Sequence, residues 1–146
     1  MKLTYPEKLQ VVAKHQHSAP IQTVPLAQEL GLKVWHFPNW PKELSGKIER
    51  STTHGGSSGY AIFVNESHHK NRRRFTTAHG IADDALYRSK LANAVEAQAN
   101  KLAADILMPW QLLNQQIENG VNSVLKLAEV FQVSESAMAI RMGSPA

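Results

Sequence analysis

A histidine and an aspartate four residues apart, His79 and Asp83, are the first pair of side chains in this sequence whose types and spacing suit a chemical function. Positions i and i+4 lie on one face of an α-helix, so the imidazole and the carboxylate could hold one divalent ion. The chain contains no cysteine, so histidine, aspartate or glutamate would have to supply the ligands. The simpler interpretation, which we favour, is a buried, hydrogen-bonded His79 with Asp83 bonded to it or to solvent.

A basic run over residues 68–74, His-His-Lys-Asn-Arg-Arg-Arg, is the second feature that could bind a ligand. Its arginines, Arg72, Arg73 and Arg74, could contact phosphates or an acidic protein surface. Alternatively, they are solvated side chains at the start of a helix. Cations are unfavourable there, because the helix macrodipole has its positive end at the N-terminus. Because no aromatic residue interleaves with the run to stack on bases, we favour a protein contact over nucleic acid. Trp40, which lies between two prolines, is a further candidate contact residue.

The composition is that of an ordinary globular domain. Of 146 residues, 42% are hydrophobic and 19% charged, which argues against disorder and favours a single domain over residues 1–146. The net charge is +4, and the excess lies in residues 1–90, because residues 91–146 hold more acidic than basic side chains. No signal segment and no run of about 18 apolar residues is present, so we expect a cytoplasmic protein without membrane contact.

The hydrophobic pattern predicts helices, then strands, then helices, which is an α+β organisation. Residues 1–65 are expected to hold two helices and a sheet, residues 71–108 a helix pair with the candidate site, and residues 109–142 the C-terminal helices. The three strands are expected to form a small, mostly antiparallel sheet packed on helices. The predicted helices are 6–16, 24–30, 71–88, 92–108, 110–117, 123–131 and 134–142, and the predicted strands are 32–37, 44–52 and 60–65.

Three blocks of sequence, in this order, resemble the ImmA/IrrE family of metallo-endopeptidases. Residues 74–83 read Arg-Phe-Thr-Thr-Ala-His-Gly-Ile-Ala-Asp, similar to the R-F-T-x-A-H-E-x-x-H helix of that family. Residues 96–109 resemble its E-x-x-A-N-x-x-A-x-x-L-L-M-P helix, and residues 127–137 its L-A-x-x-F-x-V-S-x-x-A segment. The resemblance covers about residues 20–142 and implies a zincin-like domain with a helical C-terminal half.

The resemblance also implies which residues would form the site. His79 matches the first zinc ligand and Glu96 the third, but the motif is degenerate, His79-Gly80-Ile81-Ala82-Asp83. Gly80 stands where the family has its general-base glutamate, and Asp83 stands where it has the second histidine. Glycine cannot take a proton from metal-bound water, and loss of a general base costs roughly 10²–10⁴-fold in rate. A trio of His79, Asp83 and Glu96 would favour a harder ion such as Mn²⁺ over Zn²⁺.

These features predict a catalytically inactive relative of a zinc metallo-endopeptidase that acts as a protein-binding regulator. By analogy with the family, the expected partner is a helix-turn-helix transcription regulator or a toxin–antitoxin component, such as those of phages and other mobile elements. No bound cofactor is expected, zinc or another divalent ion being the alternative. Two other functions stay open: a metal-dependent peptidase with the altered His79, Asp83 and Glu96 site, and a nucleic-acid-binding protein that uses the arginines 72–74.

Overall fold

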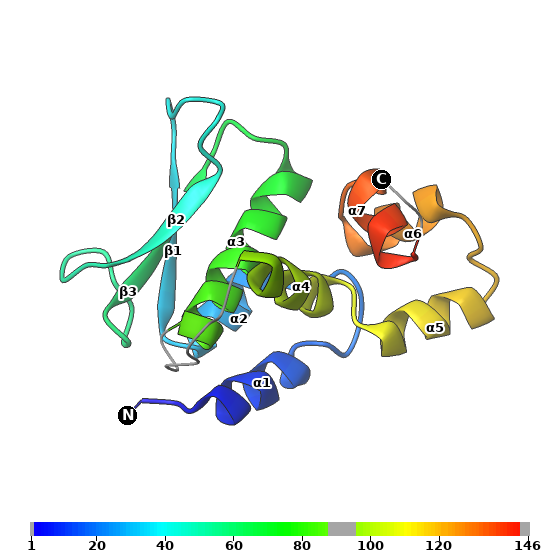
Figure 1. Ribbon diagram of the computed structural model, residues 1–146, viewed down its shortest axis with the longest axis horizontal. Coiled ribbons are helices and arrows are strands. Elements are labelled where there is room, and N and C mark those ends of the chain that lie inside the picture. Colours follow the sequence, from blue (N-terminus) through cyan, green and yellow to red (C-terminus); the bar gives the residue numbers. More distant parts are fainter. Residues whose placement is uncertain (1, 88–95, 144–146) are drawn as a thin grey trace.

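The computed structural model describes residues 2–87 and 96–143, and within these it contains a three-stranded sheet and seven helices. The α+β organisation predicted from the pattern is confirmed (Figure 1). The first part of the chain forms α1 (Tyr5–Lys14), α2 (Thr23–Glu29), β1 (Leu32–Phe37), β2 (Gly46–Arg50) and β3 (Tyr60–Asn65). The second part forms α3 (Lys70–Tyr87), α4 (Glu96–Leu107), α5 (Trp110–Glu118), α6 (Val124–Phe131) and α7 (Glu135–Arg141).

Local signals in the sequence explain where several helices begin. The Thr4 side chain accepts a hydrogen bond from the Glu7 backbone N–H, and the Glu7 carboxylate accepts one from the Thr4 N–H, which is a reciprocal capping box. This bond from the Thr4 backbone lowers the pKa of Glu7 from its ordinary value. Ser123 and Ser134 cap α6 and α7 in the simpler way, by accepting bonds from backbone N–H groups three residues later.

The sheet is mixed, so the expectation of a mostly antiparallel sheet is wrong in this detail. The strand order is β1-β3-β2, with β3 parallel to β1 and antiparallel to β2. The chain reverses direction after β1 and again after β2, so β3 runs in the same direction as β1 and lies between the other two. Alternation of apolar residues shows which face of a strand is buried, but not which strand is its neighbour.

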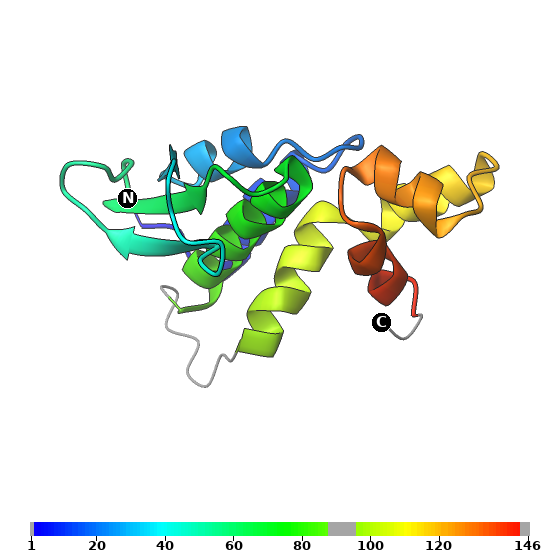
Figure 2. The same cartoon turned by 90° about the horizontal axis from the view of Figure 1, so that it is seen from above.

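Helix α3 is the centre of the fold. It contacts β2 and β3 on one side and α4 on the other, with α1 and α2 against it as well (Figure 2). From the sheet, Ile62 and Val64 of β3 are buried, and Ala78, Ile81 and Ala82 of α3 are fully buried. Between them, Gly80 of α3 lies directly against Ile62, so the helix approaches the sheet closely, and this approach shapes the site.

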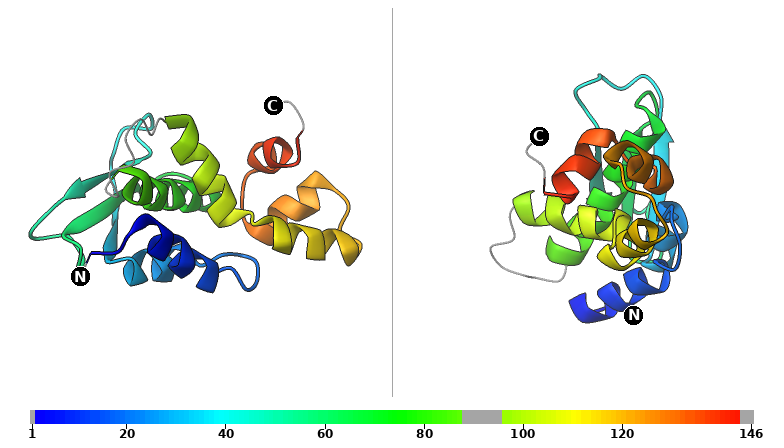
Figure 3. Two further views of the ribbon diagram at one scale, coloured as in Figure 1. Left: turned by 60° about the horizontal axis from the view of Figure 1, so that its bottom comes forward. Right: turned by 90° about the vertical axis from the view of Figure 1, so that its right-hand side faces the viewer.

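Helices α5, α6 and α7 lie at the end of the molecule away from the sheet (Figures 1 and 3). Two arginines join them to the rest of the chain. Arg74 of α3 donates to backbone carbonyls at the end of α6, and Arg141 of α7 donates to the Met108 carbonyl and to the Asp105 carboxylate. The organisation of residues 1–146 as a single domain stays a prediction. Within residues 2–87 and 96–143, no helix is long and apolar enough to cross a membrane.

Candidate functional site

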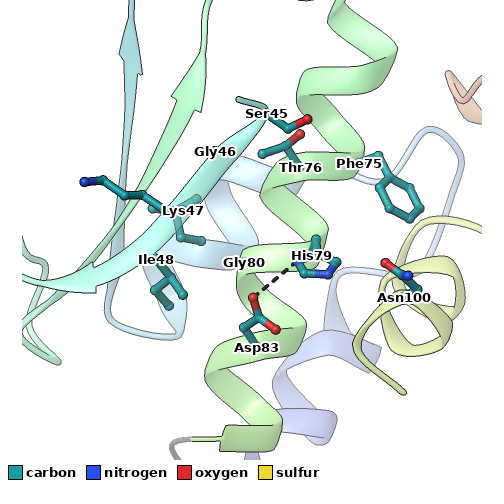
Figure 4. A pocket seen from close by; sticks show the side chains of 11 residues that line it. Ser45, Gly46, Lys47, Ile48, Phe75, Thr76, His79, Gly80, Asp83 and Asn100 are labelled. Atoms are coloured by element: carbon teal, nitrogen blue, oxygen red, sulfur yellow. Dashed lines mark ion pairs between the residues drawn. The ribbon is translucent and has the colours of Figure 1, made fainter. Parts of the chain in front are cut away.

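The predicted pairing of His79 with Asp83 is present on α3. The His79 Nδ1 atom lies 3.2 Å from Asp83 Oδ2, and both side chains are about one-fifth exposed. They occupy successive turns of the helix and point toward one another (Figure 4). The i, i+4 spacing thus brings the two groups together as the sequence predicts, in an ion pair whenever the histidine is protonated.

Both side chains line a cavity of about 320 Å³. One wall is the edge strand β2 with the residue before it, the floor is α3, and Asn100 of α4 lies on the far side (Figure 4). Among the described residues that line the cavity, Asp83 supplies the one carboxylate. Sequence reasoning placed His79 and Asp83 but missed the β2 wall, because strand pairing brings it to α3 from 30 residues away. The lining residues are Ser45, Gly46, Lys47, Ile48, Ile62, Phe75, Thr76, His79, Gly80, Asp83 and Asn100.

Gly80, at the position that matches the family's general base, is packed directly against the sheet. A Cβ atom built at this position would lie 2.9 Å from Ile62 Cδ1 and 3.0 Å from both Ile62 Cγ atoms. Carbon atoms in ordinary contact are about 3.5–4.0 Å apart, so any larger residue must displace Ile62 or the helix. Ile62 is itself only 1% exposed. The loss of the glutamate is therefore accompanied by loss of the space that its side chain would need.

Two of the three candidate metal ligands have geometry that suits a metal. Ligands about 2.0–2.2 Å from a tetrahedral ion stand roughly 3.3–3.6 Å apart, close to the spacing of His79 Nδ1 and Asp83 Oδ2. The other carboxylate oxygen, Asp83 Oδ1, is buried without a hydrogen-bond partner among the described residues. Glu96 begins α4, but its side chain lies outside the described residues, so the full trio stays a prediction. Among the residues that the structure describes, no group of three potential ligands is found.

Asp84, the neighbouring carboxylate, belongs to a different part of the molecule. It is 1% exposed and lies with Oδ2 3.2 Å from Nζ of Lys8 on α1, which is 3% exposed. Lys8 Nζ also donates to the Asp84 backbone carbonyl. One residue along a helix turns the side chain by about 100°, so Asp84 points into the α1–α3 contact and away from the cavity. Sequence reasoning missed this ion pair, because nothing in the pattern of α1 marks Lys8 as buried.

The three arginines of the basic run have different surroundings. Arg72 is exposed and donates to Ser45 Oγ beside the cavity. Arg74 is half-buried and donates through Nε to the Gln132 carbonyl and through Nη2 to the Phe131 carbonyl. Burial lowers the pKa of the Arg74 guanidinium from its ordinary value, although an arginine remains charged at neutral pH. Arg73 lines a second cavity, which Arg74 also lines. The run is therefore not one continuous basic surface.

Replacing Arg74 with alanine is expected to destabilise the chain by about 2 kcal/mol. Two charge-assisted hydrogen bonds are lost, and the carbonyls at the end of α6 lose their donors. Urea denaturation followed by circular dichroism measures the change. Arg72→Ala is the matched control, and its exposed bond to Ser45 predicts a change of at most about 0.5–1 kcal/mol. Equal effects of the two substitutions would show that Arg74 does not hold α6.

Trp40 belongs to an aromatic cluster on the face of the sheet opposite α3. Its ring lies 5.7 Å from that of Phe37, which stacks on Phe63 at 5.2 Å. His54 contacts Phe63 edge-on, and Trp35 contacts His54. Trp40 is partly buried by this packing and partly exposed. The part of its ring that stays accessible is suited to a protein contact.

Comparisons with known proteins show which fold and which family this chain resembles. A structure described as a Mycobacterium tuberculosis transcriptional regulator has a similar fold, with a TM-score of 0.64 and 16% sequence identity. The similarity covers 94% of this chain but 46% of that one, so the chain spans a little under half the length of the regulator. No curated protein matches the chain. The family model of the IrrE N-terminal-like domain, Peptidase_M78, matches residues 27–142. The chain therefore belongs to the family of the IrrE N-terminal-like domain.

Proposed function

We propose that this chain is a protein-binding regulator that has lost the hydrolytic chemistry of its family. The observation on which this depends is Gly80. The residue that would activate water is absent, and Ile62 fills the space that a side chain at this position would need. The described residues of the cavity offer Asp83 as their one carboxylate, and it is already bonded to His79. A peptidase with this site would have to work without a dedicated general base.

The binding role is supported by the surfaces that remain. The cavity between β2 and α3 is large enough to receive a side chain of a partner. On the other face of the sheet, Trp40 and Phe37 offer accessible aromatic surface, which is enriched at protein interfaces. The likeness to a structure described as a transcriptional regulator supports a role in transcriptional control. We therefore propose a helix-turn-helix transcription regulator or a toxin–antitoxin component as the partner.

Binding can be tested in the source cells and then with purified proteins. The tagged chain is used to capture partners from an extract, and the captured protein is purified and titrated by calorimetry. We expect a DNA-binding regulator or a toxin–antitoxin protein, and we expect Trp40→Ala to weaken its binding by tenfold or more. Trp110→Ala is the matched control, because Trp110 is 48% exposed on α5, away from the sheet. Capture of neither class of partner, or equal binding by both variants, would contradict the proposal.

A metal-dependent peptidase with an altered site is the second candidate function. It is favoured by the spacing of His79 and Asp83 and by the Asp83 Oδ1 atom, which has no hydrogen-bond partner in the part of the chain that the structure describes. The test is the metal content of protein purified without chelator, measured for the natural chain and for His79→Ala. The regulator proposal needs no metal, so it predicts no stoichiometric metal that depends on His79. One equivalent that disappears in His79→Ala would favour the peptidase.

A further inference from the structure

A second cavity, of about 230 Å³, lies between the start of α2, strand β1 and the first turns of α3. Its lining includes Lys70, Arg73 and Arg74 from α3, His36 from β1 and Thr23 from α2. No carboxylate is among its described lining residues. We propose that this cavity binds the phosphate group of a small molecule. The inference does not depend on the proposed regulatory function, because the cavity is lined by different residues from the one at His79.

The charge of the cavity is the first argument. Lys70, Arg73 and Arg74 place three positive charges around a space smaller than most ligand pockets, and His36 adds a fourth when protonated. Such a cluster is unfavourable for the empty protein, since like charges repel and lie at the positive end of α3. A phosphate group, with up to two negative charges, offsets more of this repulsion than a single carboxylate does.

The state of the individual side chains is the second argument. Among the described residues, the guanidinium of Arg73 has no hydrogen-bond or ion-pair partner, although the residue is only partly exposed. Arg74 uses two of its five N–H donors on the carbonyls of Phe131 and Gln132. Both guanidinium groups therefore keep donors for an anion. Arginine is well matched to phosphate, because its planar fork of N–H groups can bond two oxygens at once.

A small ligand fits this arrangement better than a nucleic acid. Nucleic acid binding needs cations spread along a track that follows the phosphate backbone. Here Arg72 is bonded to Ser45 on the other side of α3, and Arg74 lies beneath α6. The remaining cations line one open cavity instead of an extended track.

The contacts of Arg74 predict a consequence for the rest of the fold. Arg74 lines the cavity, and its guanidinium holds the end of α6 through the Phe131 and Gln132 carbonyls. An anion bound to its free edge would fix the guanidinium, and the end of α6 would open less often. Phosphate binding should therefore slow amide hydrogen exchange in the residues that follow α6, whose N–H groups bond back to that helix.

The test is calorimetric titration of the full chain with inorganic phosphate and inorganic pyrophosphate, with ionic strength held constant by sodium chloride. We expect saturable binding to the natural chain and a dissociation constant raised by about tenfold or more in Arg73→Gln. Arg72→Gln is the matched control, because it removes the same charge one residue away and does not line the cavity. Its dissociation constant should stay within about twofold of the natural value.

Each other outcome overturns the assignment. Absence of saturable phosphate binding, or equal weakening by Arg72→Gln and Arg73→Gln, would show that no built phosphate site exists. Citrate binding as tightly as phosphate would indicate a carboxylate ligand. Binding of duplex DNA that is tighter than binding of pyrophosphate, and that both substitutions abolish, would indicate a nucleic-acid surface. Thermal unfolding of both variants without ligand checks that they fold, so a loss of binding is not a loss of structure.

Discussion

Replacing Asp84 with alanine is expected to lower the free energy of unfolding by about 3–5 kcal/mol. Asp84 and its partner Lys8 are 1% and 3% exposed, and their charged atoms are 3.2 Å apart. Without the carboxylate, the ammonium group is left buried between α1 and α3 without its counter-charge. Urea denaturation followed by circular dichroism measures the change.

Two further variants test whether the cost comes from the uncompensated charge. The double substitution Lys8→Met with Asp84→Leu removes both charges, and it should recover most of the stability lost in the single variant. Glu49→Ala removes one partner of the exposed Lys47–Glu49 pair, whose charged atoms are 3.1 Å apart. That control should change stability by at most about 1 kcal/mol. A cost for Asp84→Ala no larger than for Glu49→Ala would show that water solvates Lys8.

Gly80→Ala is expected to destabilise the chain by about 1–3 kcal/mol, although alanine favours a helix by about 1 kcal/mol over glycine. The added Cβ would lie 2.9–3.0 Å from three carbon atoms of Ile62. Because Ile62 is buried between β3 and α3, it has little room to move. Equilibrium denaturation in urea gives the change. A Gly80→Ala variant that is more stable than the natural chain would show that α3 and β3 can move apart without loss of stability.

A double-mutant cycle with Ile62→Val isolates this contact. Ile62→Val alone should cost about 0.5–1.5 kcal/mol, and combined with Gly80→Ala it should cost less than the sum of the two single changes. The same logic applies to restoring the motif of the family. Gly80→Glu with Asp83→His should remain destabilised while Ile62 is intact, and reducing Ile62 to alanine should relieve the clash. Additive effects in the cycle would mean that Ile62 does not limit the size of residue 80.

Much of the fold follows from local patterns in the sequence. The strand at residues 60–65 and the helix over residues 70–87 were predicted to within one residue, because alternation and the 3–4 spacing of apolar residues are strong there. The parallel pairing of β1 with β3 was not predictable, since it depends on which strand enters the middle of the sheet. The ion pair of Lys8 with Asp84 joins positions 76 residues apart and leaves no mark in either helix.

At the site, too, local patterns predict some features, and others depend on tertiary packing. The pattern placed His79 and Asp83 on one helical face, and the structure confirms their contact. The identity of Gly80 indicated a missing general base, but only the packing of α3 on β3 shows that Ile62 occupies the space. In the sequence, the arginines at 72–74 form one basic run. A helix turns about 100° per residue, so adjacent side chains meet different neighbours. Arg72 contacts Ser45, whereas Arg73 and Arg74 line a cavity and Arg74 also bonds the end of α6.

The most direct measurement of the central claim is the intact mass of the captured partner after incubation with the chain. Zinc is supplied in one sample and manganese in another, and His79→Ala serves as the matched control. We expect the partner to keep its full mass over several hours in every sample, bound but not cleaved. New termini that form with the natural chain, that require metal and that are absent with His79→Ala would contradict the claim that this protein binds without hydrolysis.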